Sequence, residues 1–385
     1  MKPKICGIAT KSIMIKSFML GNLQYMAEHG WNCFCLCSDD SSLKKDELKD
    51  VEYIPLDIEW GFVSPLRFFK EIKTLYKVFK RERFDVIQYA ATNASLYAAI
   101  AGWMARVPVR INPQWGISYP IYKGKVRFIR KLATKLTCIF STSNQPDSFS
   151  NLEFMRNEGL CNEKNSCVIY NGSACGVDLQ RFNMRKKQQW KDEILSMYGI
   201  NKENIVLGFV GRLVKEKGIN ELIDAFLSLK LNNCKLMLVG PLDDNSRINE
   251  SLLSEAKASP NIIFTGPTRT PEKYFSSFNY MMLPSYQEGF GMTTLEAAAL
   301  GVPAIVTNIK GPTDVVVNGV NGFICEVRSV DSLKETILKA ITLDPESYEK
   351  MSNNAYSIVK EKFDSSDFKV KFLENRNQLL EETRK

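Results

Sequence analysis

Two glutamates eight residues apart, Glu288 and Glu296, stand in a stretch whose residue types are suited to bind phosphate or sugar oxygens. The stretch follows an apolar run, has glycine at positions 289 and 291, and continues into an alanine-rich segment that predicts a helix. Backbone N–H groups at a helix N-terminus bind such oxygens. We expect both carboxylates to point toward one ligand. The spacing alone also allows Glu288 to cap the helix and Glu296 to be solvated.

A second stretch, residues 208–218, places two cations where an apolar run ends and a helix is predicted to begin. Arg212 follows the predicted strand, and Lys217 precedes the predicted helix. Two cations in this position are suited to hold a diphosphate through charge-assisted hydrogen bonds. Taken alone, the two side chains are also compatible with ordinary surface charges.

The elements that position these stretches follow from alternating apolar and amphipathic segments. Helices are predicted between the strands, and the clearest of them span residues 16–29, 64–80 and 93–106. Such alternation indicates parallel sheets, so the predicted class is α/β, with two doubly wound Rossmann-like domains that face each other across a cleft. The predicted strands are 5–8, 33–37, 86–88, 109–111, 138–141, 167–170, 205–210, 236–239, 262–265, 280–283 and 304–307.

The 385 residues are enough for two domains with a core each. The expected domains are residues 1–180 and 181–365, and residues 366–385 form a C-terminal helix that could pack back on the first domain. In open α/β sheets, ligands bind at the carboxyl ends of the strands. We therefore expect the active site in the cleft between the domains.

Composition excludes several classes of protein. No uncharged apolar run reaches roughly 18 residues, so no membrane span is predicted, and the first residues show no signal peptide. The ten cysteines form no CxxC pair and accompany a single histidine, which argues against a zinc site. Cys33, Cys35 and Cys37 are expected on one face of a strand as reduced core thiols. A cytoplasmic location follows.

Positive charge is concentrated in the first half of the chain. Residues 1–200 carry 29 basic and 19 acidic side chains, a net charge of +10, whereas the remainder carries −2. This asymmetry suggests an anionic partner, such as a membrane surface or a phosphorylated acceptor. Nucleic acid is not expected, because no aromatic–basic repeat or helix-turn-helix spacing occurs.

The segment 123–135 is a predicted helix with six basic and no acidic side chains. Apolar Val126, Ile129 and Leu132 fall on one face of it. Two interpretations remain open. In the first, the apolar face packs on the sheet and the basic face is solvated. In the second, the basic face rests on anionic lipid. The basic side chains around the other face are Arg127, Arg130, Lys131 and Lys135.

Taken together, these stretches resemble the retaining GT-B glycosyltransferases of family four, the "glycosyl transferases group 1". The family pattern combines a strand followed by G-R and K-G with an E-x7-E element that starts E-G-F-G. Both occur here in order. Residues 176–182 also resemble the family's G-V-D-x-x-R-F. The resemblance covers nearly the whole chain and is strongest from 168 to 325.

The resemblance implies roles for individual residues. Arg212 and Lys217, after Gly211, would bind the donor diphosphate, Glu288 would hold hydroxyls of the transferred sugar, and Glu296 would hold the nucleotide ribose. Arg212, Lys217 and Glu288 would be the catalytic residues. No metal or other cofactor is expected, and the chain contains no Asp-x-Asp motif. Further donor contacts would come from the backbone of Gly289, Phe290, Gly291 and Met292 and from the base pocket at Gly266, Pro267 and Thr268.

Two departures from the family concern the acceptor side. Residues 9–13 replace a Gly-Gly loop, which makes Lys11, Ser12 and Lys16 candidates for contacts with a phosphate or acceptor. Residues 112–116 replace a loop that often carries a histidine, and there Gln114 and Trp115 are the candidates. The only histidine, His29, is expected at the end of a helix. A mechanism with a histidine base is therefore disfavoured.

The function expected from this resemblance is a retaining glycosyltransferase. It would move a sugar from a nucleotide-diphosphate sugar to a glycan or lipid-linked acceptor in bacterial surface polysaccharide assembly, in the cytoplasm or on the inner face of the cell membrane. A GT-B sugar-nucleotide 2-epimerase and a non-catalytic sugar-nucleotide-binding subunit are the alternatives. A dehydrogenase is disfavoured, because no G-x-G-x-x-G occurs.

Overall fold

A computed structural model gives the positions of residues 2–56, 64–90, 92–243 and 246–384. The chain forms two compact units, Met1–Gly176 with Ser366–Lys385, and Val177–Ser365. The first unit ends slightly before the expected limit at residue 180, because Val177 is bonded to a later segment of the second unit. Its N–H donates to Phe363 O at 2.7 Å, and its carbonyl accepts from Ser365 N at 2.9 Å.

Both units contain a six-stranded parallel sheet of the doubly wound type. In the first unit the strand order is β3-β2-β1-β4-β5-β6, and in the second it is β12-β11-β10-β7-β8-β9. In each sheet the order reverses between two central strands, β1 and β4 or β7 and β10, which is the point where such folds bind ligands. The first sheet comprises β1 (Lys4–Lys11), β2 (Asn32–Ser38), β3 (Val51–Pro55), β4 (Val86–Tyr89), β5 (Val109–Asn112) and β6 (Ser143–Asn144). The second sheet comprises β7 (Ile205–Val210), β8 (Cys234–Val239), β9 (Ile262–Gly266), β10 (Tyr280–Leu283), β11 (Ala304–Thr307) and β12 (Gly322–Cys325).

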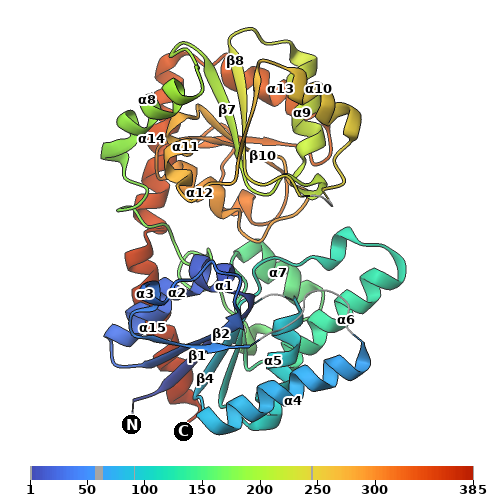
Figure 1. Ribbon diagram of the computed structural model, residues 1–385, viewed down its shortest axis with the longest axis vertical. Helices are drawn as coiled ribbons and strands as arrows, with labels where there is room; N and C mark the ends of the chain where they lie inside the picture. Colours follow the sequence, from blue (N-terminus) through green and yellow to red (C-terminus); the bar gives the residue numbers. More distant parts are fainter. Residues whose placement is uncertain (1, 57–63, 91, 244–245, 385) are drawn as a thin grey trace. The chain divides into compact units, whose positions relative to one another are not determined.

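Helices cover both faces of each sheet (Figure 1). The helical segments of the first unit are α1 (Ser12–Met14), η1 (Ile15–Met19), α2 (Leu20–Glu28), α3 (Lys45–Leu48), α4 (Pro65–Glu82), α5 (Thr92–Ala105), η2 (Tyr119–Ile121), α6 (Gly124–Phe140), α7 (Phe149–Asn157), η3 (Glu163–Asn165) and α15 (Ser365–Glu382). Those of the second unit are η4 (Met184–Lys186), α8 (Lys187–Met197), η5 (Lys215–Lys217), α9 (Ile219–Leu229), α10 (Glu250–Ala258), α11 (Pro271–Ser277), α12 (Met292–Ala298), η6 (Pro312–Asp314), α13 (Val330–Ile341) and α14 (Pro345–Lys362).

Alternating side chains of β2 supply the two cores of the first unit. Cys33, Cys35 and Cys37 are buried in one core together with side chains of α2 and α15, which confirms that the three thiols share a strand face. Phe34 and Leu36 point to the opposite core, against α4 and α5. The sheet is therefore covered by α2 and α15 on one side and by α4 and α5 on the other (Figure 1).

The C-terminal helix α15 is part of the first unit and is fixed there by a buried arginine. Arg376 is fully buried and donates to Gln88 Oε1 at 2.5 Å and to Gln145 Oε1 at 2.8 Å. Its guanidinium also lies 3.8 Å from the centre of the Phe372 ring. Because no carboxylate takes part in these contacts, burial lowers the pKa of Arg376 to about 9.

Three predicted elements differ in the structure. The prediction of a strand at 138–141 is wrong, because α6 continues to Phe140. Ser141 then donates to Thr137 O through both its N–H and its hydroxyl. Residues 167–170 form no strand, since β6 has only two residues and pairs with this region through a single bridge at Ser166. The helix predicted at 16–29 starts earlier and contains the π-helical turn η1.

Helix α6 also contradicts the first interpretation, in which its apolar face packs on the sheet. The structure exposes that face instead. Phe128 is 69% exposed, and Ile129 and Leu132 are each 47% exposed. By contrast, Arg130 and Lys131 are partly buried. We call the exposed side the apolar face of α6; it comprises Val126, Phe128, Ile129, Leu132 and Ile139.

Candidate functional site

The centre of the candidate site is an ion pair at the switch point of the second sheet. Lys217 follows β7, and Glu288 follows the neighbouring strand β10. Lys217 Nζ lies 2.5 Å from Glu288 Oε1, with side chains 27% and 11% exposed. The structure therefore brings together two of the three residues for which the sequence predicted catalytic roles.

Two contacts hold the loops that carry this pair. Gly218 has a φ of +72°, and a Cβ on it would lie 2.0 Å from Pro284 O, so only glycine fits between the loops. In addition, Tyr286 N donates to Glu216 O at 2.9 Å. The turn η5 is thereby fastened to the segment after β10, which fixes where the Lys217 side chain starts.

Two linked hydrogen bonds next to the pair orient Glu288. Ser285 Oγ donates to Glu288 Oε1 at 2.6 Å, and Thr307 Oγ1 donates to Ser285 O at 2.5 Å. Ser285 and Thr307 are both buried. The carboxylate is therefore positioned from three strand ends, those of β7, β10 and β11.

Arg212 also follows β7 but is turned toward a different loop. Its Nη1 lies 3.6 Å from Asp243 Oδ2, and the arginine side chain is 63% exposed. Gly211 precedes it with its backbone against Gly240, where a Cβ would lie 1.9 Å from Gly211 O. Arg212 is thus an exposed cation at the same sheet edge, held by a weaker contact than Lys217.

Glu296 lies in α12 and is partly buried. Burial raises the pKa of its carboxyl to about 7, while the charge of Arg181 lowers it and that of Glu272 raises it. Arg181 itself pairs with Glu272 at 3.0 Å. A carboxyl with a pKa raised toward neutral pH, and with no ion pair of its own among the described residues, is typical of a ligand-binding position.

The remaining donor-side candidates lie at the end of β9 and in the segments that follow β9 and β10. The Phe290 side chain is buried against Phe363, so only its backbone is available to a ligand. Gly291 precedes α12 with a φ of +81°. Gly266 ends β9 with a φ of +74°, and Pro267 after it is exposed. Gly289 and Met292 are partly buried, as is Thr268.

In the first unit, two of the acceptor-side candidates are bound to carboxylates. Ser12 is buried and donates to Asp40 Oδ1. Lys16 Nζ lies 2.7 Å from Glu47 Oε1. Lys11, at the end of β1, is exposed. The structure therefore leaves Lys11 as the more accessible of the three for an incoming anion.

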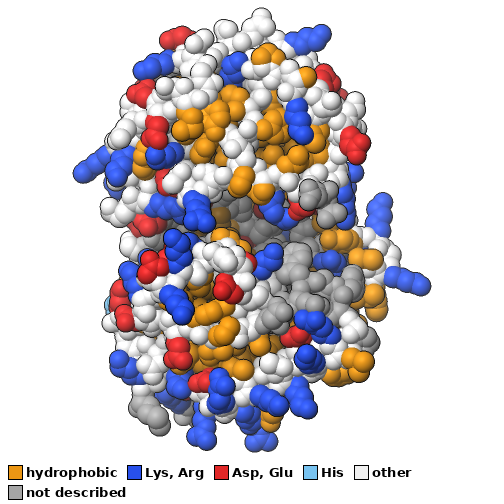
Figure 2. Space-filling view, in the orientation of Figure 1, with side chains coloured by type: hydrophobic (Ala, Val, Ile, Leu, Met, Phe, Trp, Pro, Cys, Tyr) orange, Lys and Arg blue, Asp and Glu red, His pale blue; other side chains and the backbone are white. Residues whose placement is uncertain are grey.

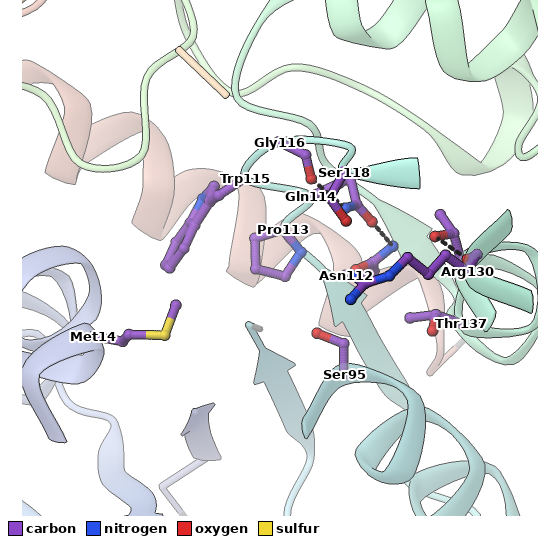
Figure 3. Close-up of a pocket in the computed structure, with 11 residues that line it drawn as sticks. Met14, Ser95, Asn112, Pro113, Gln114, Trp115, Gly116, Ser118, Arg130 and Thr137 are labelled. Atoms are coloured by element: carbon purple, nitrogen blue, oxygen red, sulfur yellow. Dashed lines mark hydrogen bonds between the residues drawn. The ribbon is translucent and has the colours of Figure 1, made fainter. Parts of the chain in front are cut away.

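Gln114 and Trp115 line a pocket at the carboxyl end of β5 (Figure 3). Gln114 Nε2 donates to Gly116 O at 2.7 Å, and the Trp115 ring packs against Phe18 with centroids 5.3 Å apart. In Figure 3 Trp115 and Met14 lie on one side of the pocket, and Arg130 enters from the other. The pocket has a volume of about 110 Å³.

Sequence reasoning missed the residues that orient the site. Ser285 and Arg181 act on Glu288 and Glu296 from neighbouring loops. Ser285 adjoins a predicted strand end, which is a usable signal. Both interpretations of residues 123–135 left Arg130 on the outer, basic face of the helix, either solvated or against lipid, whereas the structure places it at a pocket. No periodicity of α6 distinguishes these two positions.

His29 and the possible metal ligands were also located. His29 follows α2, close to the segment that starts β2, so it lies at the sheet edge opposite the strand carboxyl ends. The residues that the structure describes contain no group of three or more His, Cys, Asp or Glu side chains arranged to hold a metal. No helix among them is both long and apolar enough to cross a bilayer.

The fold and the site together define a class of protein. Both units have the doubly wound order of nucleotide-binding domains, and the second joins a lysine and a glutamate at its switch point. This is the architecture of the GT-B enzymes. Residues 191–358 match the family "Glycosyl transferases group 1", and residues 4–143 match "Glycosyl transferase 4-like". The chain belongs to the group 1 glycosyltransferases of the GT-B fold.

Relatives and solved structures agree with this assignment. The chain is 29% identical to "Capsular polysaccharide biosynthesis glycosyltransferase CapM" of Staphylococcus aureus, over 94% of this chain and 93% of that protein. It is 28% identical to the "N,N'-diacetylbacillosaminyl-diphospho-undecaprenol alpha-1,3-N-acetylgalactosaminyltransferase" of Campylobacter jejuni, over 79% and 80% of the two chains. A glycosyltransferase structure from Rickettsia africae has the same fold, with a TM-score of 0.80, 16% identity and coverage of 98% and 99%.

Proposed function

We propose that the protein is a retaining glycosyltransferase that uses a nucleotide-diphosphate sugar and needs no bound metal. The observation that carries this proposal is the Lys217–Glu288 pair at the switch point between β7 and β10. A cation and a carboxylate in contact are suited to a donor in which a diphosphate adjoins a sugar ring, since the lysine binds phosphate and the carboxylate binds hydroxyls.

In the proposed reaction the bond between C1 of the donor sugar and the diphosphate oxygen breaks. The acceptor hydroxyl oxygen forms the new bond to C1 on the same face, and its proton passes to the departing diphosphate oxygen. Arg212 and Lys217 stabilise the negative charge that develops on the diphosphate, which is the largest contribution such a site supplies. Glu288 orients the sugar, and Glu296 accepts hydrogen bonds from the ribose.

The position of His29 weighs against the epimerase alternative. That reaction needs acid and base groups beside the sugar, and the only histidine of the chain lies at the opposite edge of the first sheet. A binding subunit without activity would keep the donor contacts but show no turnover. The two alternatives therefore differ from the proposal in what a purified protein does to a donor.

For the acceptor, we propose a glycan linked to a lipid diphosphate, in bacterial surface polysaccharide assembly. The Campylobacter relative is named for a diphospho-undecaprenol acceptor, and the Staphylococcus relative for capsule synthesis. The apolar face of α6 supports a membrane-bound acceptor, since exposed aromatic and aliphatic side chains beside lysines and arginines are typical of helices that rest on anionic membranes.

The first experiment is a transfer assay with purified protein, a panel of nucleotide sugars and short-chain lipid-diphosphate glycans. We expect release of nucleoside diphosphate only with acceptor present, and a product that keeps the anomeric configuration of the donor, as measured by NMR. An inverted product would contradict the retaining mechanism. A new donor epimer formed without acceptor would establish the epimerase alternative instead.

Metal independence is tested in the same assay. Because Arg212 and Lys217 supply the positive charge at the diphosphate, we expect EDTA to leave the transfer rate nearly unchanged. If EDTA abolishes transfer and Mn²⁺ or Mg²⁺ restores it, the enzyme requires a metal ion and the proposed metal independence is wrong. Donor binding without any turnover, with every acceptor, would favour the non-catalytic subunit.

A further inference from the structure

The pocket beside Gln114 and Trp115 has one charged wall. It lies between the end of β5 and helix α6, and its lining among the described residues contains no acidic side chain. Arg130 is the charged residue of this lining. In Figure 3 its guanidinium lies next to Asn112 and above Ser95. A volume of about 110 Å³ is sufficient for several water molecules or for one phosphate group.

Three of the four hydroxyl groups that line the pocket already donate to backbone carbonyls. Thr134 Oγ1 donates to Arg130 O at 2.9 Å, Thr137 Oγ1 to Ala133 O at 2.9 Å, and Ser95 Oγ to Tyr89 O at 3.3 Å. The guanidinium of Arg130 is therefore the charged donor that the lining offers to a ligand. These geometric facts favour an anion over a neutral sugar as the occupant.

Arg130 differs from the neighbouring cations of α6 in its contacts. Lys131 Nζ lies 2.6 Å from Glu158 Oε2, and Lys135 Nζ donates to Gly159 O. The Arg130 guanidinium lies 4.3 Å from the centre of the Tyr122 ring, and its Nε is buried without a hydrogen-bond partner among the described atoms. An arginine N–H left unpaired inside a protein is costly, and a phosphate that draws the guanidinium toward the pocket would offset this cost.

We infer that this pocket binds a phosphate group of the acceptor, with Arg130 as its cationic ligand. The inference rests on the proposed function, in which the acceptor glycan is joined to its lipid through a diphosphate. A phosphate held at the end of β5 places the attached sugar at the carboxyl edge of the first sheet, where ligands of such folds bind. Arg130 is thus a binding residue for the acceptor and takes no part in donor contacts.

The test is a titration followed by NMR at two groups of the pocket. The Nε–Hε signal of Arg130 is assigned from its loss in Arg130→Gln, and the indole N–H of Trp115 from its loss in Trp115→Phe. The probes are a short, water-soluble prenyl diphosphate, inorganic pyrophosphate and inorganic phosphate. Because the signals belong to this pocket, diphosphate bound at Lys217 in the other unit does not confuse the measurement.

We expect the prenyl diphosphate to shift both signals to saturation and to bind more tightly than either inorganic ion. Arg130→Gln should weaken the affinity, measured at the Trp115 indole, by roughly tenfold or more, since a charge-assisted contact is lost. Arg127→Gln is the matched control. Arg127 lies three residues before Arg130 on the same helix, is exposed and does not line the pocket. It should change the affinity less than twofold. Arg130→Lys, which keeps the charge, should retain part of the binding.

Three results would overturn the inference. The first is that no probe shifts either signal in the wild-type protein, and the second is that Arg130→Gln and Arg127→Gln bind equally well. The third is that inorganic phosphate binds as tightly as the prenyl diphosphate, which would make this a site for free phosphate. None of these measurements requires sugar transfer, so a failure of the transfer assay would contradict the proposed function and leave this result standing.

Discussion

Lys217 Nζ and Glu288 Oε1 lie 2.5 Å apart, although 71 positions separate the two residues along the chain. The contact exists because β7 and β10 are neighbours in the sheet and the segments after both strands meet at one edge. In the proposed donor complex, a diphosphate beside this pair would be a second anionic partner for the lysine. The hydrogen bond from Ser285 would then keep the glutamate oriented.

Replacing Lys217 with alanine should lower kcat/KM for the donor by roughly tenfold to a hundredfold. It removes a charge-assisted contact to the diphosphate, worth about 1.5–3 kcal/mol. Steady-state kinetics measure the effect. Lys215→Ala is the matched control, because Lys215 belongs to the same turn η5 but is exposed. Equal activity of the two variants would contradict a role for Lys217 at the diphosphate.

Gly218→Ala should impair both folding stability and transfer, because the new Cβ would collide with Pro284 O and push apart the loops that hold Lys217 and Glu288. Gly199→Ala separates this collision from backbone strain. Gly199 has a similar φ of +62°, yet a Cβ on it meets nothing within 4 Å. Denaturant unfolding should show a loss of about 1 kcal/mol for Gly199→Ala and a clearly larger loss for Gly218→Ala. Equal losses would show that the loops can separate without cost.

Glu296 should make nucleotide binding depend on pH. Its pKa of about 7 means that the ionised fraction rises about tenfold between pH 6 and pH 8. In the proposed complex this ionised form accepts hydrogen bonds from both ribose hydroxyls. We expect the affinity for the nucleoside diphosphate to rise with pH over this range. The phosphate of the ligand also ionises there, so the comparison is with Glu296→Gln, in which only the Glu296 contribution disappears. Identical pH profiles, measured by calorimetry, would exclude a ribose contact.

The same carboxyl should affect stability in the opposite direction. The pKa of Glu296 is higher in the folded protein than in the unfolded chain, so the unfolded state releases the proton more readily. The contribution of this group to the free energy of unfolding is therefore full below the unfolded value near pH 4.5 and is lost as the pH rises to about 7. Urea unfolding of Glu296→Gln should lack this decline, and a parallel decline in both proteins would place its cause elsewhere.

The strands of the second sheet were predictable because they are buried on both faces. Residues 205–210, 280–283 and 304–307 were predicted as strands, and β7, β10 and β11 have these bounds. A strand covered by helices on both sides is a continuous apolar run with abrupt polar ends. The same feature made the positions of Arg212 and Glu288 predictable, since both follow such an end.

The contacts that orient the site were not predictable in the same way. The place of Ser285 beside a predicted strand end indicates that it lies near the site, but the turn after β10 decides that its hydroxyl donates to Glu288. For α6, the 3.6-residue period reveals that Val126, Ile129 and Leu132 share a side, but it cannot say whether that side faces the core. The structure exposes it, and Arg130 takes the inner position instead.

The exposed apolar face of α6 should bind anionic membranes. Orange hydrophobic side chains interleave with blue basic ones over α6 at the right of Figure 2. Trp103 of α5 extends this surface; it is 55% exposed and packs against Phe140 with ring centroids 5.2 Å apart. Apolar side chains that enter the interface add hydrophobic free energy to the attraction of basic side chains for lipid phosphates. Because Lys131 is paired with Glu158, charge reversal on this helix would disturb the fold, and the apolar residues give the cleaner test.

We therefore predict that Phe128→Ser combined with Leu132→Ser weakens binding to phosphatidylglycerol vesicles by at least tenfold. Each substitution removes an apolar side chain from the membrane interface, so binding loses part of the roughly 1.5–3 kcal/mol that full burial of such a side chain supplies. Vesicle co-sedimentation measures the binding, and 0.5 M NaCl should weaken the wild-type interaction by screening the basic side chains. Met197→Ser in α8 is the control, since Met197 is 60% exposed in the other unit and should not contribute. If the wild-type protein ignores anionic vesicles at low salt, or the double variant binds as well as Met197→Ser, α6 is not a membrane-binding helix, and the acceptor must reach the site in soluble form.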